Sequence, residues 1–197
     1  MKLAALLLPL LFCVQSNEEL RKELLAMGEI DQKIQLDQNL NPLSGPDHDA
    51  KQVYVFVQNT KRLREIIRTQ GFPTAAQVGK DGMKMVFLII QHSDFAPEFQ
   101  EKCLPTFRKM AMNGEIPKQD YAYLFDRIRV NTGRKQLYGS QLAYDKDANP
   151  YPKPVEDPKN LDKRRAEMGM STEQEYLDVV KGFQRDMKKK LEKNGGS

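Results

Sequence analysis

Apolar residues recur at helical spacing over most of the chain, and short polar, proline- or glycine-containing stretches separate these runs. A spacing of three or four residues places side chains on one face of a helix. Residues 17–35 predict a polar helix on this basis, since a thin apolar stripe runs among their charged residues: Leu20, Leu24, Ile30 and Ile34. The fold is therefore expected to begin with an amphipathic helix.

A second helix is expected beyond the loop of residues 41–49, which contains two prolines and a glycine. Asp49 could serve as its N-cap, and the helix should stop before Gly71 because Pro73 prevents its continuation. Its apolar positions follow a 3.6-residue period: Val53, Phe56, Val57, Leu63, Ile66 and Ile67.

The most apolar segment covers residues 83–90 and follows a possible short helix and turn at residues 75–82. Its β-branched content would suit a buried strand, whereas Asp81 as an N-cap and the two methionines favour a buried helix. The helix is the preferred interpretation. The segment runs directly into four hydrogen-bonding side chains: Gln91, His92, Ser93 and Asp94.

A further helix is predicted after this segment, with Asp94 as N-cap and Pro97 in the first turn. It should end at Gly114, and Pro117 should start another helix that continues through residues 121–127. The apolar stripe of the first of these helices contains Phe99, Cys103, Phe107, Met110 and Ala111.

From residue 127 on, the spacing of apolar residues no longer follows the helical period. Residues 127–141 predict a β-hairpin, in which Gly133 supplies the turn. Residues 145–158 contain four prolines and predict a wrapped arm, and a short helix and a long last helix follow it. The predicted fold is mainly α: a compact irregular helix bundle with one small β-hairpin and a proline-rich C-terminal arm.

Composition supports one globular domain, with 40% hydrophobic and 29% charged residues in a chain of 197. The lack of Trp and an aromatic content of 8% speak against an aromatic-rich platform for sugars or bases. The net charge of +4 is concentrated near the C-terminus and is interpreted as a solvated helix end, so nucleic-acid binding is not expected. The predicted division is residues 17–48 as N-terminal helix and loop, residues 49–182 as the helical domain, and residues 183–197 as a basic tail.

Residues 1–16 predict a secretory signal peptide: Lys2 precedes an apolar run, and Asn17 would begin the mature chain. Secreted or periplasmic localisation follows, without membrane contact after cleavage. The alternative is a lipoprotein anchored through Cys13. Cleavage before Asn17 would leave Cys103 as the single cysteine. Its helical spacing from Phe99 and Phe107 favours a small buried hydrophobe, and the alternative is a nucleophile.

Known catalytic and cofactor motifs are missing from the sequence. It contains no HExxH, CxxC, GxSxG, Walker loop or GxGxxG, and residues 145–150 lack the glycine and the closing glutamate of an EF-hand. His92 with Asp94 or Asp126 gives too few ligands for a zinc site. We therefore predict neither a metal nor a cofactor.

The candidate site consists of polar residues that end apolar segments. His92 could act as a general acid or base, with Asp126 as its orienter, and Arg127 could hold an anionic group. The structural alternatives are a core histidine bonded to a carbonyl, an internal Asp126–Arg127 pair, or Asp126 accepting from hairpin amides.

The predicted hairpin carries further hydrogen-bonding side chains that suit a pocket wall. If two helices finish at the same end of the bundle and the hairpin caps that end, the candidates converge there. We name His92 and Asp126 as catalytic candidates. The candidates for substrate binding are Asp94, Arg127, Gln136, Tyr138, Gln141 and Arg165.

Several short motifs occur in order along the chain: GFPT, LIIQHSD, YAYLFDR, GRKQLYGSQ and EDPKNLDKRR. Over roughly residues 50–180 this order resembles a bacterial domain-of-unknown-function family, number sixty-six twenty-four, whose pattern is GWPT…QHxD…DR…QxYGTQ. Phe72 replaces the Trp of that pattern and Ser140 replaces its Thr. The family name implies no activity. From the residues we expect an exported hydrolase or transferase acting on a small polar or peptide-like substrate, or a ligand-binding or interaction domain whose polar cluster is structural.

Overall fold

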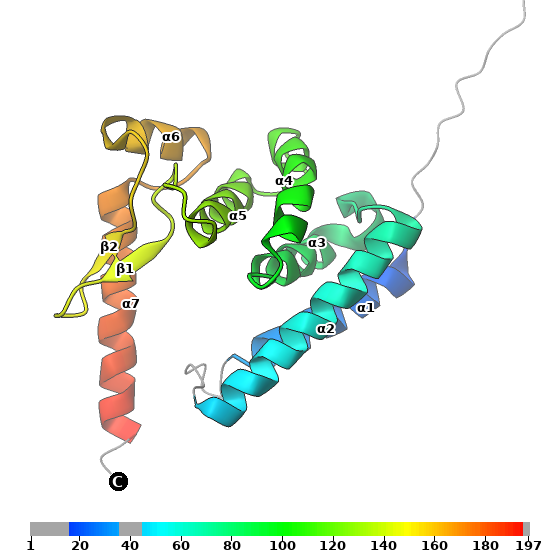
Figure 1. Cartoon of the computed structure of the whole chain (residues 1–197), viewed down its shortest axis with the longest axis horizontal. Helices are drawn as coiled ribbons and strands as arrows, with labels where there is room; N and C mark the ends of the chain where they lie inside the picture. Colours follow the sequence, from blue (N-terminus) through cyan, green and yellow to red (C-terminus); the bar gives the residue numbers. More distant parts are fainter. Residues whose placement is uncertain (1–15, 36–44, 195–197) are drawn as a thin grey trace, which may run out of the picture.

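The computed structural model describes residues 16–35 and 45–194. The predicted signal segment with Cys13, and most of the loop before the second helix, lie outside these residues. Within the described part, seven α-helices, one short 3₁₀ helix and one two-stranded hairpin follow each other along the chain (Figure 1). The mainly α fold with a single small hairpin is therefore confirmed.

The first three helices form one side of the molecule: α1 (Glu18–Lys33), α2 (Pro46–Gln70) and α3 (Ala75–Gln91). In Figure 1, α1 lies beside α2, and both pack against α3. The side chain of Asn17 caps α1 by accepting from the Leu20 amide at 3.0 Å, and Thr74 with Gln77 forms a capping box at the start of α3. Side-chain caps thus mark where α1 and α3 begin.

The middle of the molecule is built from α4 (Pro97–Met112) and α5 (Lys118–Asn131), which pack against each other and against α3. Burial of their apolar faces with those of α1–α3 forms the main core. Cys103 lies in this core, and burial raises the pKa of its thiol to about 12, so the thiol is a packed apolar group with little thiolate character. Fully buried members of the core include Leu24, Leu63, Val86, Ile90, Phe107 and Leu124.

The C-terminal part consists of β1 (Leu142–Tyr144), β2 (Pro150–Pro152), the 3₁₀ helix η1 (Pro158–Asn160), α6 (Leu161–Glu167) and α7 (Glu173–Asn194). The two strands are antiparallel, with Ala143 opposite Tyr151. In Figure 1 the long helix α7 stands on the side of the molecule opposite α1 and α2. A capping box of Thr172 and Glu175 starts this helix.

The predicted position of the hairpin is wrong. Residues 127–131 continue α5, because Ile128 belongs to its buried face, and the hairpin forms from residues 142–152. Gly133 does supply a positive φ, of 75°, but it terminates a helix. The Arg134 amide donates to the Arg129 carbonyl at 2.7 Å, the bond that closes a Schellman turn.

Three predicted caps and three stripe positions are also wrong. Asp81 lies inside α3, whose N-cap is Thr74, and Val53 and Val57 of α2 are exposed. Gly45 is the N-cap of α2, so Asp49 lies inside that helix, and Ala96 is the N-cap of α4 in place of Asp94. Ile30 is 54% exposed, whereas the neighbouring Asp31 is fully buried. The buried face of α1 therefore carries a carboxylate.

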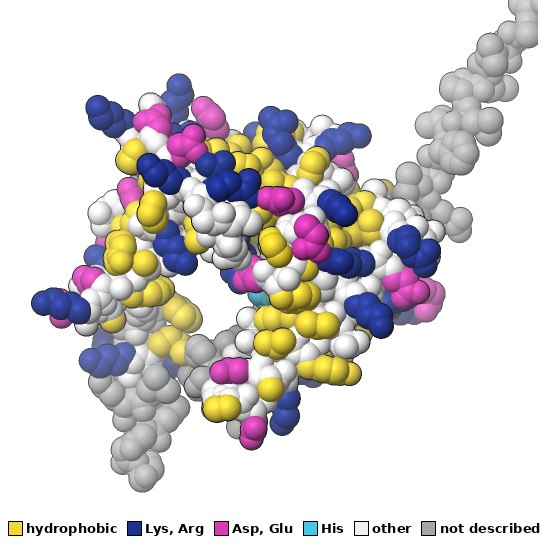
Figure 2. All heavy atoms as spheres, in the orientation of Figure 1, with side chains coloured by type: hydrophobic (Ala, Val, Ile, Leu, Met, Phe, Trp, Pro, Cys, Tyr) yellow, Lys and Arg dark blue, Asp and Glu magenta, His cyan; other side chains and the backbone are white. Residues whose placement is uncertain are grey.

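The surface mixes charges of both signs. Figure 2 shows Lys, Arg, Asp and Glu side chains interspersed over one face, with apolar side chains gathered over α2 and over the hairpin. The predicted boundary at residue 182 falls inside α7, which runs on to Asn194. Among the described residues, no helix combines the length and the apolar character that a membrane crossing requires.

Candidate functional site

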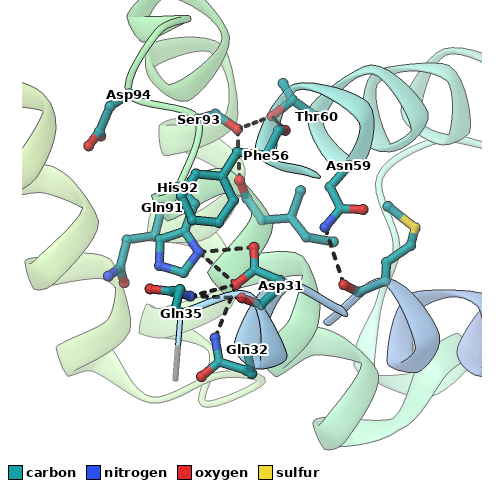
Figure 3. A network of polar contacts seen from close by, with 12 residues as sticks. Asp31, Gln32, Gln35, Phe56, Asn59, Thr60, Gln91, His92, Ser93 and Asp94 are labelled. Atoms are coloured by element: carbon teal, nitrogen blue, oxygen red, sulfur yellow. Dashed lines mark hydrogen bonds and ion pairs between the residues drawn. The ribbon is translucent and has the colours of Figure 1, made fainter. Parts of the chain in front are cut away.

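His92 directly follows α3, and its imidazole meets a carboxylate of α1. Its Nδ1 lies 2.8 Å from Oδ1 and 3.0 Å from Oδ2 of Asp31 (Figure 3). Asp31 is fully buried, and the side chain of His92 retains 10% exposure. A buried carboxylate in this position holds the Nδ1–H tautomer and leaves Nε2 as the basic nitrogen.

Further contacts fix both members of this pair. The side-chain amides of Gln32 and Gln35 each donate to Oδ1 of Asp31 at 3.0 Å. The ring of Phe56 on α2 stacks on the imidazole, with centroids 4.7 Å apart and an interplanar angle of 22°. Among the described residues, Nε2 has no hydrogen-bond partner. The imidazole is thus held by Asp31 at Nδ1 and by Phe56 on one face of the ring.

Ser93 is next to His92 but points the other way (Figure 3). Its hydroxyl donates to the Ile89 carbonyl at 2.7 Å and lies 2.7 Å from the Thr60 hydroxyl, and the residue is fully buried. These contacts join the end of α3 to α2. Ser93 therefore has a structural role and does not face the imidazole as a nucleophile would.

Asp94 binds Arg127 of α5 in a bidentate ion pair. The guanidinium Nε is 2.8 Å from Oδ1, and Nη2 is 2.5 Å from Oδ2. Asn131 also donates to Oδ1, at 2.8 Å, and Gln100 does so at 3.3 Å. The arginine side chain is 28% exposed. This ion pair ties the segment after α3 to α5, two residues from His92.

Asp126 is fully buried and binds backbone amides. It accepts from the amides of Leu137 (2.8 Å), Tyr138 (3.1 Å) and Ser140 (3.0 Å). Gly139 has a φ of 64°, which allows this short loop to turn its amides toward one carboxylate. Burial raises the pKa of Asp126, and the amide hydrogen bonds oppose that rise. Asp126 is therefore the anchor of the 137–140 loop and does not orient His92.

The other candidates from the C-terminal half brace the same region. Gln136 donates to the Gln141 and Lys153 carbonyls at 2.9 and 2.8 Å, and accepts from the Gln141 amide at 2.9 Å. The buried Arg165 donates to the Tyr138 and Ser171 carbonyls, both at 2.6 Å. Tyr138 itself is buried, and its ring meets Phe125 edge-on.

The structure thus separates the residues that were expected to converge. His92 lies with Asp31, Asp94 lies with Arg127, and the remaining candidates stabilise the segment that follows α5. Sequence reasoning missed Asp31. Its position was detectable, since it continues the series Leu20, Leu24 and Met27 at helical spacing on the buried face of α1. Among the described residues, no group of three or more His, Cys, Asp or Glu side chains could hold a metal ion.

Comparisons with curated proteins and with solved structures give no match. A family model described as "Family of unknown function (DUF6624)" matches residues 18–188. This span includes α1 with Asp31, the end of α3 with His92, and most of α7. The chain therefore belongs to the DUF6624 family.

Proposed function

We propose that this chain is an exported hydrolase or transferase that acts on a small polar or peptide-like substrate, with His92 as the general base and acid. The observation that carries the proposal is the contact of 2.8 Å between His92 Nδ1 and the buried carboxylate of Asp31. In this role Asp31 is the positioning residue. It fixes the tautomer and stabilises the imidazolium that forms when Nε2 takes a proton.

Arg127, whose partner Asp94 is two residues from His92 along the chain, would hold the anionic or carbonyl group of the substrate. Its Nε and Nη2 are engaged by Asp94, and Nη1 has no hydrogen-bond partner among the described residues. The side chain is partly exposed, so this third nitrogen can donate to a ligand. The Asp94 pair would keep the guanidinium in a fixed orientation.

The role of His92 is tested by comparing His92→Gln with His48→Gln, a change at the only other histidine of the chain. Hydrolysis is measured on a panel of nitrophenyl esters and aminoacyl nitroanilides. We expect His92→Gln to lower any rate found with the unaltered chain at least about 100-fold, because proton transfer is lost. His48→Gln should leave that rate unchanged. Equal rates for the two variants would contradict the proposal.

The second candidate is a non-catalytic ligand-binding or interaction domain whose polar residues are structural. It is favoured by the way Asp126, Gln136 and Arg165 direct their hydrogen bonds to backbone groups of the chain itself. Urea unfolding of His92→Ala distinguishes the candidates. A loss of about 2 kcal/mol or more, together with no hydrolysis by the unaltered chain, would favour the structural role.

Export is supported by the signal-like pattern of residues 1–16. We expect the mature protein isolated from its own host to begin at Asn17, which intact-mass measurement would reveal. A mass that corresponds to a lipid-modified chain beginning at Cys13 would instead establish the lipoprotein. The full, uncleaved mass in the soluble fraction would contradict both.

A further inference from the structure

A cavity of about 460 Å³ lies between α3 and the segment that leads into α5. The apolar residues around it are Met83 and Phe87 of α3, Phe107 of α4, and Ile116 and Pro117 before α5; the first three are at most 3% exposed. Its volume is within the range of small-molecule sites in proteins. The cavity borders the Lys80–Phe87 part of α3, and neither His92 nor Asp31 lines it, so the two sites are separate.

One wall of this cavity carries a mostly buried carboxylate whose partner among the described residues is a lysine ammonium. Asp120, in the first turn of α5, has a side chain only 6% exposed. No described residue donates a hydrogen bond to it, and its nearest cation is Lys84, with Nζ 3.6 Å from Oδ1. Burial raises the pKa of Asp120, and Lys84 opposes that rise. This ion pair is longer than a normal hydrogen bond, so the carboxylate can accept a closer donor from outside the chain.

Lys84 is a counter-ion that can be displaced. Its side chain is 49% exposed, and its ammonium also sits 4.6 Å from the centroid of the Phe87 ring. A long, half-exposed lysine can move its ammonium into water with little loss, because the charge stays solvated. A ligand that brings its own positive charge to Asp120 could therefore take this place.

We propose that this cavity binds a small ligand with a protonated amino group and an apolar body. The ammonium would donate to the Asp120 carboxylate, which can accept several hydrogen bonds. The apolar body would lie against Pro117 and Ile116 at the cavity wall, and the ring of Phe87 next to Lys84 would also attract the cation. A neutral or an acidic ligand of the same shape has no ammonium group to donate to this carboxylate.

The test compares two probes of similar size and opposite charge, phenethylamine and 3-phenylpropionate. Each is titrated into the full chain by calorimetry at about pH 8, where an aliphatic amine is protonated. We expect saturable binding of phenethylamine and none of 3-phenylpropionate. Failure of the amine to bind, or equal binding of the acid, would overturn the proposal.

Three variants locate the probe and keep the test independent of folding defects. Asp120→Asn should weaken amine binding at least about tenfold, because the charged acceptor is lost. Lys84→Met should strengthen it, because the competing cation is removed while Asp120 is retained. Lys109→Met, at an exposed lysine that does not line the cavity, is the matched control and should leave affinity unchanged. Weaker binding in Lys84→Met would contradict displacement.

Discussion

Replacing Asp126 with alanine is expected to lower the free energy of unfolding by about 3–5 kcal/mol. The carboxylate is fully buried and is the common acceptor for the amides of Leu137, Tyr138 and Ser140. Alanine would leave these three donors without a partner inside the protein. Each unsatisfied buried amide costs about 1–3 kcal/mol, and relaxation of the loop recovers part of that sum. Urea unfolding followed by circular dichroism measures the change.

Asp145→Ala is the matched control for this prediction. Asp145 also accepts from backbone amides, those of Asp147 and Asn149 at 2.9 and 2.8 Å, but it is exposed. Water can replace its hydrogen bonds, so we expect a loss below about 1 kcal/mol. A similar small loss for Asp126→Ala would show that the 137–140 loop does not depend on this carboxylate. It would also return Asp126 to the set of catalytic candidates.

Replacing Arg165 with methionine is expected to destabilise the fold by about 2–4 kcal/mol. Its guanidinium donates to the carbonyls of Tyr138 and Ser171, and it lies 5.1 Å from the centroid of the Tyr176 ring. It thereby links the loop after α5 to the start of α7. Methionine retains apolar volume but leaves both carbonyls without this donor.

Lys163→Met, an exposed position on the same short helix, provides the control and should change the free energy of unfolding little. Equal stability of the two variants would contradict a structural role for Arg165. A ligand-binding role, as the sequence first indicated, would then regain support. Thermal unfolding of both variants in parallel makes the comparison direct.

The helices were largely predictable because their signals are local. Asparagine, proline and glycine positions set the start of α1 at Asn17, the end of α2 at Gly71 and the start of α5 at Pro117. The apolar period within each helix then identified most buried residues. The predicted hairpin is wrong at residues 127–131. This short segment fits both the helical and the strand period, and the burial of Ile128 decides in favour of the helix.

The candidate site was only half predictable. The sequence indicated that His92 ends a buried helix, and that Asp126 could accept from backbone amides. It did not identify Asp31 as the partner of His92, because the two residues are 61 positions apart. Helical periodicity shows which face of α1 is buried, but it does not show which side chain of another helix that face meets.

The sequence by itself therefore determined the mainly α fold, most helix ends and the family to which the chain belongs. These properties depend on spacing, capping residues and short motifs, all of which are written along the chain. The tertiary structure alone decided that Asp31 meets His92, that Asp94 binds Arg127, and that Asp120 pairs with Lys84 beside a cavity. A hydrogen bond or ion pair requires two groups within about 3–4 Å, and only the packing of helices brings distant residues that close.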